Sequence, residues 1–142
     1  MPVVYLDSSA FVKLVVEEPG SDVAARLWDD ADAVVASRLA YPEVRAALAA
    51  ARRGARLDAA SEQQARSDLE AFWAATRVIE LSEVIAEAAA ELAGELVLGG
   101  ADAVHLASAL TLVDAAPVLT TWDRRLHAAA VEAGLTVAPD RP

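Results

Sequence analysis

Val3-Val4-Tyr5-Leu6-Asp7-Ser8-Ser9 is the stretch of this sequence that indicates the fold most clearly. Four apolar residues end at an aspartate and two serines, a pattern typical of a buried strand that leads into a capped helix. We therefore expect a strand over residues 3–6. An unbroken apolar run also favours a strand that is covered on both faces, as in a parallel sheet.

The same alternation of apolar strands and Ala-rich helices continues along the chain. Further strands are expected at residues 33–36, 77–81, 118–121 and 135–137. Helices are expected at residues 10–17, 22–28, 37–53, 58–75, 82–97, 102–113 and 123–133, with caps at Ser37, Asp58 and Ser82. Alternating strands and helices predict an α/β protein, a parallel sheet covered on both faces. The tail, residues 138–142, is expected to be loose.

Length and composition limit the possible classes of protein. A chain of 142 residues that is 56% hydrophobic is expected to form one domain over residues 1–142. The absence of cysteine excludes disulfides and Cys-ligated metal sites. The N-terminus lacks the pattern of a signal peptide, and no apolar run reaches the ~18 residues of a membrane span. We therefore expect a cytoplasmic protein that does not enter the membrane.

The net charge of −10 argues against a protein that binds nucleic acid by broad neutralisation of phosphates. It is compatible with a site where clustered carboxylates bind divalent cations. One local basic run stands out against this balance, formed by Arg45, Arg52, Arg53 and Arg56. These arginines could guide a nucleic acid, or they could be solvated surface charge.

Two acids fall at the ends of expected strands. Asp7 directly follows the first strand, and Asp123 lies two residues after the fourth. Ligands of open parallel sheets bind beyond the carboxyl ends of strands, near the point where the strand order reverses. The two carboxylates would therefore meet if these strands are neighbours. The alternative is that each aspartate only caps the helix that follows it.

Glu43 and Asp102 fall near the starts of expected helices, where the helix dipole favours a charged carboxylate. Taken alone, Glu43 could lie on a solvated face and Asp102 could be a cap. His105 could bind metal, but a packed or hydrogen-bonded histidine is expected because hard cations prefer oxygen. His127 is expected at an exposed helix position.

The set of four acids carries a family resemblance over nearly the whole chain. The segments concerned are Tyr5-Leu6-Asp7-Ser8-Ser9-Ala10-Phe11-Val12-Lys13-Leu14, Ser37-Arg38-Leu39-Ala40-Tyr41-Pro42-Glu43-Val44-Arg45, Ala101-Asp102-Ala103-Val104-His105-Leu106-Ala107-Ser108-Ala109 and Leu119-Thr120-Thr121-Trp122-Asp123. In order and spacing they resemble the PIN-domain family, and most of all its VapC toxin branch. The resemblance implies a three-layer α/β/α sandwich with a five-stranded parallel sheet in the order 3-2-1-4-5.

The resemblance also implies a function. It implies an endoribonuclease that depends on Mg²⁺ or Mn²⁺, leaves a 5′-phosphate and a 3′-hydroxyl, and pairs with a VapB-type antitoxin. The metal acids of the family map onto Asp7, Glu43, Asp102 and Asp123, and its supporting hydroxyls onto Ser9 and Thr121. A homodimer is expected, and the helices over residues 10–28 and 58–75 offer apolar positions for dimer or antitoxin contacts.

Carboxylate oxygens suit hard cations, and such a cation activates water and neutralises a phosphodiester. We expect Asp7 and Asp102 to hold the main metal, with Glu43 and Asp123 completing its shell or holding a second ion. A haloacid-dehalogenase-type phosphatase would need a second acid where Ser9 stands, and a receiver domain would need a different acid pattern. The stronger alternative is a PIN-like module that binds RNA or protein without cleaving.

Overall fold

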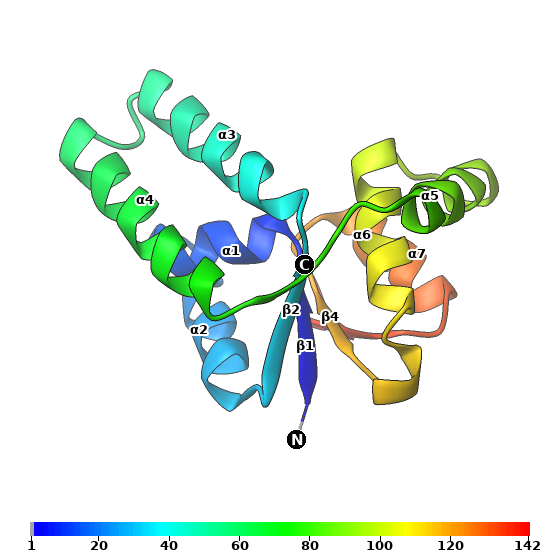
Figure 1. The fold of residues 1–142 in the computed structure, drawn as a ribbon. Coiled ribbons are helices and arrows are strands. Elements are labelled where there is room, and N and C mark those ends of the chain that lie inside the picture. Colours follow the sequence, from blue (N-terminus) through cyan, green and yellow to red (C-terminus); the bar gives the residue numbers. More distant parts are fainter. Residues whose placement is uncertain (1) are drawn as a thin grey trace.

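The computed structural model describes residues 2–142, so Met1 of the expected domain lies outside the described residues. Its centre is a five-stranded parallel sheet in the order β3-β2-β1-β4-β5, which confirms the predicted order (Figure 1). The strands are β1 (Val3–Leu6), β2 (Ala33–Ser37), β3 (Arg77–Ile79), β4 (Val118–Thr120) and β5 (Thr136–Ala138).

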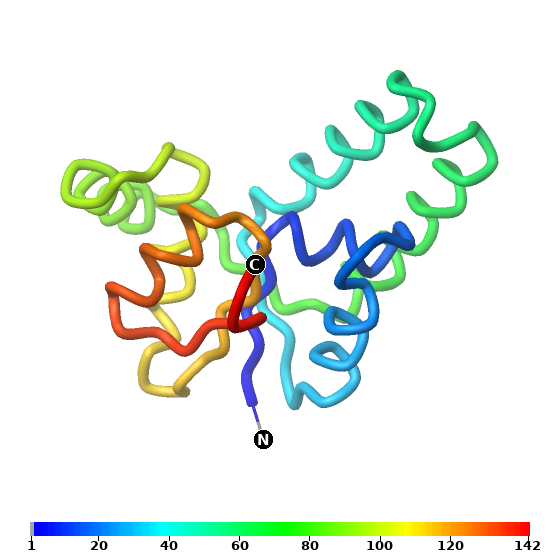
Figure 2. Tube along the Cα trace, turned by 180° about the vertical axis from the view of Figure 1, so that it is seen from behind, coloured from blue at the N-terminus to red at the C-terminus, as the bar shows by residue number. Residues whose placement is uncertain are grey.

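Helices cover both faces of the sheet, as predicted for a three-layer sandwich. One face carries α1 (Ser8–Val15), α2 (Ser21–Asp30), α3 (Ala40–Arg53) and α4 (Ala59–Ala74). The other face carries α5 (Glu83–Glu95), α6 (Gly100–Leu110), the 3₁₀ turn η1 (Val113–Ala115) and α7 (Arg124–Glu132). The view from behind shows the same two groups on opposite sides of the strands (Figure 2). Helices α3 and α4 extend as an antiparallel arm beyond the sheet.

The core is divided by the sheet, because successive side chains of a strand point to opposite faces. In β1, Val4 and Leu6 pack in the core beside α1, α3 and α4, whereas Tyr5 packs on the side of α6 and α7. All three are fully buried. The apolar run at residues 3–6 is therefore explained by a strand that has no solvated face.

Several helices begin where a side chain satisfies the free amides of the first turn. Asp58 and Ser82 are N-caps, as predicted, and accept hydrogen bonds from Ser61 N and Ile85 N. Asp7 caps α1, so that helix begins at Ser8 and not at residue 10.

The prediction that Ser37 caps α3 was wrong. Ser37 Oγ accepts a hydrogen bond from Leu39 N within the turn, and α3 begins only at Ala40. The prediction of a loose tail over residues 138–142 was also partly wrong. Ala138 belongs to β5, its carbonyl accepts a hydrogen bond from Thr121 N, and the Pro139 carbonyl lies 2.8 Å from His127 Nε2. Among residues 2–142, no helix is both long enough and apolar enough to cross a membrane.

The reversal of strand order lies between β1 and β4. Leu6 pairs with Thr120, so the residues that follow these strands, Asp7 and Thr121, come together at the carboxyl edge of the sheet. Helix α3 begins on one side of this edge and helix α6 on the other (Figure 1). The fold thus brings together the starts of α1, α3, α6 and α7, which are distant in sequence.

Candidate active site

Asp7 lies at the junction of β1 and α1 and is buried, with 3% of its surface exposed. Its Oδ1 accepts hydrogen bonds from Ser9 Oγ at 2.6 Å and from Ala10 N at 3.0 Å, and its Oδ2 accepts one from Thr121 Oγ1 at 2.5 Å. Burial raises the pKa of Asp7, while the neighbouring His105 and the three hydrogen bonds oppose that rise. The fold therefore holds this carboxylate in one orientation at an electrostatic cost.

The two hydroxyls beside Asp7 also connect β1 to the β4–α7 segment. Ser9 Oγ accepts a hydrogen bond from Trp122 N at 2.9 Å, and Thr121 Oγ1 accepts one from Asp123 N at 3.0 Å. Asp123 is the N-cap of α7 and accepts a hydrogen bond from Leu126 N. The capping roles considered for Asp7 and Asp123 are thus real, and in both residues they coexist with a position at the carboxyl edge of the sheet.

Asp102 is different because it is not a helix cap. Gly99 is the N-cap of α6, and Asp102 lies in the first turn with a half-buried side chain. Burial, then Asp123, and to a smaller extent Asp7 and Glu43, raise its pKa to about 6, and His105 acts in the opposite direction. An acid that feels three other acids in this way shares their electrostatic environment.

Glu43 lies in the first turn of α3, and its side chain reaches across to α6. Its Oε1 lies 2.6 Å from Nε2 of His105, whose own side chain is buried. On the other side of the ring, Nδ1 lies 2.8 Å from the hydroxyl of Tyr5 in β1. Burial strongly raises the pKa of Tyr5, so the phenol stays protonated. Glu43 is therefore tethered and does not lie on a freely solvated face.

The four predicted acids thus come from four separate segments and face the same edge of the sheet. They do not form a ready-made metal cage: among residues 2–142, no group of three or more His, Cys, Asp or Glu side chains is placed so that it could hold a metal ion. The chemistry of the donors nevertheless fits a hard divalent cation. All four are carboxylates, and the pKa of Asp102 is raised first by burial and then by repulsion from the other acids, which a cation would offset.

The histidines have more specific contacts than the sequence indicated. His105 is hydrogen-bonded, as expected, but its link between Tyr5 and Glu43 was missed because the three residues are far apart in sequence. The spacing of three residues puts His105 on the helix face that carries Asp102, but it identifies neither of the two partners. The exposed position expected for His127 was wrong, because this side chain is half-buried and bonded to the Pro139 carbonyl.

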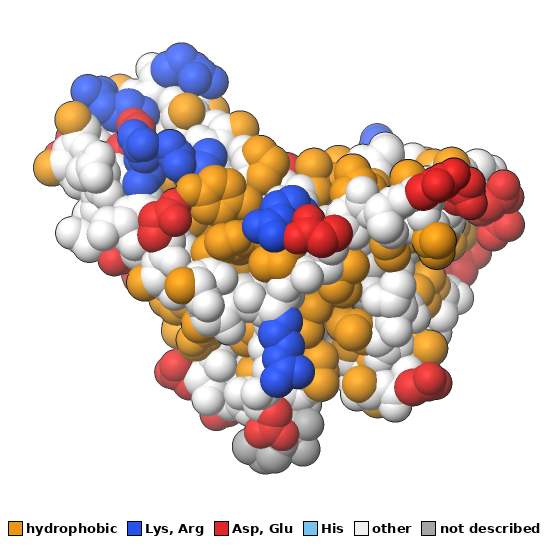
Figure 3. Space-filling model, viewed as in Figure 1, with side chains coloured by type: hydrophobic (Ala, Val, Ile, Leu, Met, Phe, Trp, Pro, Cys, Tyr) orange, Lys and Arg blue, Asp and Glu red, His pale blue; other side chains and the backbone are white. Residues whose placement is uncertain are grey.

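The basic run falls on the α3–α4 arm, where arginine side chains gather in the space-filling view (Figure 3). Arg45 donates to the Tyr41 hydroxyl, and Arg52 lies 3.9 Å from Glu62. Arg53 and Arg56 are exposed. The arm therefore carries exposed arginines among acids of its own, beside a site that is rich in acids.

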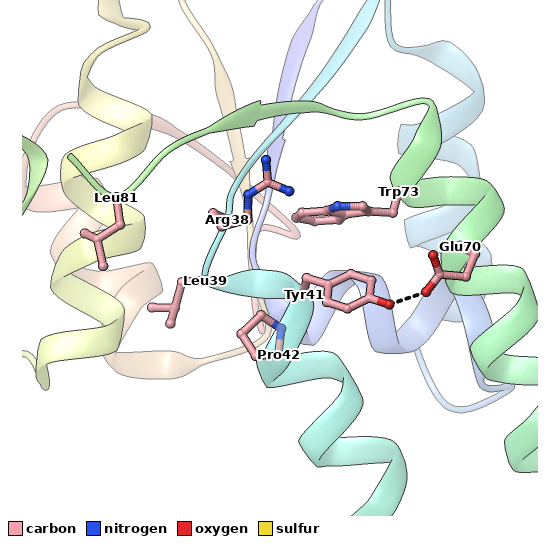
Figure 4. Close-up of a pocket in the computed structure, with 7 residues that line it drawn as sticks. All are labelled: Arg38, Leu39, Tyr41, Pro42, Glu70, Trp73 and Leu81. Carbon is pink, nitrogen blue, oxygen red and sulfur yellow. Dashed lines mark hydrogen bonds between the residues drawn. The ribbon is translucent and has the colours of Figure 1, made fainter.

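A groove of about 530 Å³ lies beside the first turn of α3, between Trp73 and Leu81 (Figure 4). Tyr41 and Trp73 lie with their ring centroids 5.5 Å apart, and the Tyr41 hydroxyl is hydrogen-bonded to Glu70. None of the four acids lines this groove. Tyr41 and Glu43 are two residues apart, yet their side chains contact α4 and α6 respectively, so the groove and the acids are separate features.

Comparison with known proteins identifies relatives over nearly the whole chain. The PIN domain family model matches residues 4–132. Ribonuclease VapC45 of Mycobacterium tuberculosis is 55% identical over 139 residues, which cover 98% of this chain and 96% of that protein.

Solved structures with the same fold include two of low identity. FitAcB from Neisseria gonorrhoeae has a TM-score of 0.70 at 19% identity, covering 94% of this chain and 95% of that chain. A toxin–antitoxin complex from Klebsiella pneumoniae has a TM-score of 0.62 at 22% identity, covering 88% and 90%. These two likenesses bear on the fold alone.

Proposed function

The chain belongs to the PIN-domain family, in its VapC-type branch, and from this premise we propose that it is an endoribonuclease toxin with a divalent cation at its carboxylate site. Residues 1–142 would then form one PIN domain. A relative named as a ribonuclease, identical at 55% of the aligned residues, supports hydrolysis of RNA. The residues of the site and the dependence on Mg²⁺ or Mn²⁺ are our own assignments.

One observation carries the assignment of the site. Burial raises the pKa of Asp102 to about 6, and three other acids, Asp123, Asp7 and Glu43, add to the rise. Each of these belongs to a different strand–helix junction, so the coupling exists only because the fold brings the junctions together. Carboxylates that repel one another in this way are stabilised by a cation with a preference for oxygen.

The four acids would have different roles in binding the cation. Asp7 presents a fixed carboxylate, because Ser9 and Thr121 hold its two oxygens. Asp102, in the first turn of α6, has a side chain for which the structure gives no hydrogen bond within residues 2–142, so it would be free to adjust to a cation. Glu43 and Asp123 complete the anionic shell. A cation bound there would offset the charge of a phosphodiester and make water a better nucleophile at neutral pH.

We also propose an antitoxin partner of the VapB type and a homodimer. The membership of the VapC branch supports the first part. We propose that such an antitoxin blocks the enzyme by placing an arginine among these carboxylates, because its planar group binds carboxylates in pairs of hydrogen bonds. A structure of the complex in which no antitoxin side chain approaches the four acids would contradict this blocking mode.

The direct test compares cleavage of RNA by the wild type and by Asp7→Asn, with Mg²⁺, with Mn²⁺ and with EDTA. Asparagine keeps the shape of Asp7 and an oxygen for the Ala10 amide, so the fold should persist. We expect cleavage by the wild type with metal only, and a loss of at least about 100-fold in the variant because a metal-binding oxygen loses its charge.

The matched control is Asp58→Asn. Asp58 is also a helix N-cap, but it lies at the far end of the α3–α4 arm and accepts its hydrogen bond from Ser61 N. Activity should be unchanged. Metal titration by calorimetry completes the test: cleavage that persists equally in Asp7→Asn, or a wild type that binds neither metal, would support the alternative of a non-catalytic PIN-like module.

A further inference from the structure

A chain of hydrogen bonds connects the sheet to Glu43 through the interior of the protein. The backbone amide of Ser37, in β2, donates to the Tyr5 hydroxyl at 3.3 Å. The same hydroxyl lies 2.8 Å from His105 Nδ1, and His105 Nε2 lies 2.6 Å from Glu43 Oε1. Tyr5 and His105 are buried, and their rings meet edge to face at 6.0 Å between centroids.

We assign the direction of these hydrogen bonds as follows. The Ser37 amide donates to a lone pair of the Tyr5 oxygen, and in this assignment the phenol donates its own proton to Nδ1 of His105. An imidazole that accepts at Nδ1 carries its proton on Nε2. That N–H then points to Glu43 Oε1, and Oε2 forms no hydrogen bond within residues 2–142.

We propose that His105 is a positioning residue: supported by Tyr5, it fixes one oxygen of Glu43 so that the other faces the shared carboxylate site. The inference rests on the proposed function, because it assigns how one acid of that site is oriented toward a cation. A carboxylate ligand held by a second hydrogen bond is a recurrent arrangement, and loss of the supporting group costs about 10–100-fold in metal affinity.

The surroundings of His105 argue for this role. Its neighbours along the helix, Ala103, Leu106, Ala107 and Ala109, are buried apolar residues, so a polar ring among them requires partners for both nitrogens. Those partners come from two other elements, β1 and α3. Glu43 has several rotatable bonds and, among the described residues, no other hydrogen-bond partner for its side chain. Without His105 the fold supplies nothing that fixes its orientation.

The experiment measures Mn²⁺ affinity by calorimetry on the purified full-length chain. His105→Leu removes the donor and keeps an apolar side chain, and we expect a weakening of about 10–100-fold. His105→Gln places an amide N–H near the position of Nε2, and it should recover most of the affinity. Tyr5→Phe keeps the ring but frees His105 to rotate, so an intermediate loss of a few-fold is expected.

The control is His127→Leu. It removes a histidine that also follows an acid on the same face of its helix, four residues after Asp123. Its ring bonds to the Pro139 carbonyl, so Mn²⁺ affinity should not change. Circular dichroism and thermal melting identify any variant that fails to fold. Should His105→Leu be such a variant, the comparison of His105→Gln with Tyr5→Phe still tests the proposal. The glutamine keeps a donor for Glu43, whereas Tyr5→Phe removes the hydroxyl that orients the His105 ring.

A double-substitution cycle separates positioning from general structural support. In a Glu43→Gln background the ring no longer has a carboxylate to orient, so His105→Leu should weaken Mn²⁺ binding little further. Additive losses in the two variants would overturn the inference. So would a wild-type affinity in His105→Leu.

Nitrogen-15 NMR of the histidine rings gives a readout that needs neither metal nor RNA. In the wild type we expect the signal of a His105 ring that carries a proton on Nε2 and accepts a hydrogen bond at Nδ1, and in Tyr5→Phe a change in that signal. A wild type that fails to bind Mn²⁺ and to cleave RNA would refute the proposed function itself. A wild type that does both, combined with an unaffected His105→Leu, would refute only the positioning role.

Discussion

Asp7 and Asp102 contribute to the same candidate site, but the β1–α1 junction and the start of α6 hold them in opposite ways. Asp7 is buried, caps a helix and accepts three hydrogen bonds. Asp102 is half-buried and caps nothing, and burial together with the neighbouring acids raises its pKa to about 6. In the proposed metal site, one carboxylate would then be part of the folding framework, while its counterpart would depend on the cation for its stability.

Addition of metal should give the largest effect, and it should depend on Asp102. At a Mn²⁺ concentration 100 times the dissociation constant, the free energy of unfolding of the wild type should rise by about 2.7 kcal/mol, because the folded state alone binds the ion. Asp102→Asn should show a much smaller rise at the same concentration. Chemical denaturation with Mn²⁺ and with EDTA measures both. Equal gains in the two proteins would mean that Asp102 takes no part in binding.

Removal of the Asp7 side chain should give the next largest effect. Asp7→Ala deletes a helix cap and leaves the hydroxyls of Ser9 and Thr121 without their acceptor, at a cost of about 2 kcal/mol in metal-free protein. Asp7→Asn should lose under about 1 kcal/mol because it keeps the cap. Denaturation in EDTA measures these changes. Asp58→Ala, an exposed cap without buried partners, is the control and should lose less than Asp7→Ala.

Asp102→Asn should instead stabilise the metal-free protein at neutral pH. The folded chain keeps the Asp102 proton up to about pH 6, whereas the unfolded chain releases it near the ordinary value of 3.8. Between these values the folded state binds more protons, so the free energy of unfolding falls as pH rises. At pH 7.5 asparagine should recover on the order of 1 kcal/mol, a figure reduced for the half-exposed side chain.

The measurement is a pair of denaturation curves in EDTA, one at pH 7.5 and one at pH 4. The gain should disappear at pH 4, where Asp102 of the folded protein is already protonated. Asp114→Asn, which changes an exposed acid on the same side of the sheet, should show no such difference between the two pH values. A gain of the same size at both pH values would indicate a packing effect and not relief of charge.

The β1–α1 junction with Asp7 and the start of α6 with Asp102 also differ in how far the sequence predicted them. The position of Asp7 and Asp123 at strand ends predicted that they would lie at one edge of the sheet, and the pairing of β1 with β4 confirms that geometry. Strand periodicity and capping residues are local signals, so they can be read along the chain. These local signals located the ends of the helices to within about three residues.

Contacts between distant helices could not be read in this way. The sequence could not distinguish a cap from a first-turn position for Asp102, because aspartate is common at both. It also gave no sign that His105 reaches Glu43, 62 residues away. The start of α3 was misplaced because the Ser37 hydroxyl bonds to Leu39 N in the preceding turn, an alternative that serine offers to any nearby amide.

The smallest expected effect concerns the hydroxyls that hold Asp7. The hydrogen bond from Thr121 lowers the pKa of Asp7 against the effect of burial, so Thr121→Val should raise that pKa further. Because a metal binds only the deprotonated carboxylate, Mn²⁺ binding should weaken most at low pH. We expect a loss of about three- to ten-fold at pH 6 and a smaller loss at pH 8. Thr76→Val, which removes a hydroxyl bonded to the Phe72 carbonyl in α4, is the control. If Thr121→Val weakens binding equally at both pH values, the hydroxyl orients Asp7 without changing its pKa. The contribution of Thr121 to metal binding is then explained by the geometry of the Asp7 carboxylate alone.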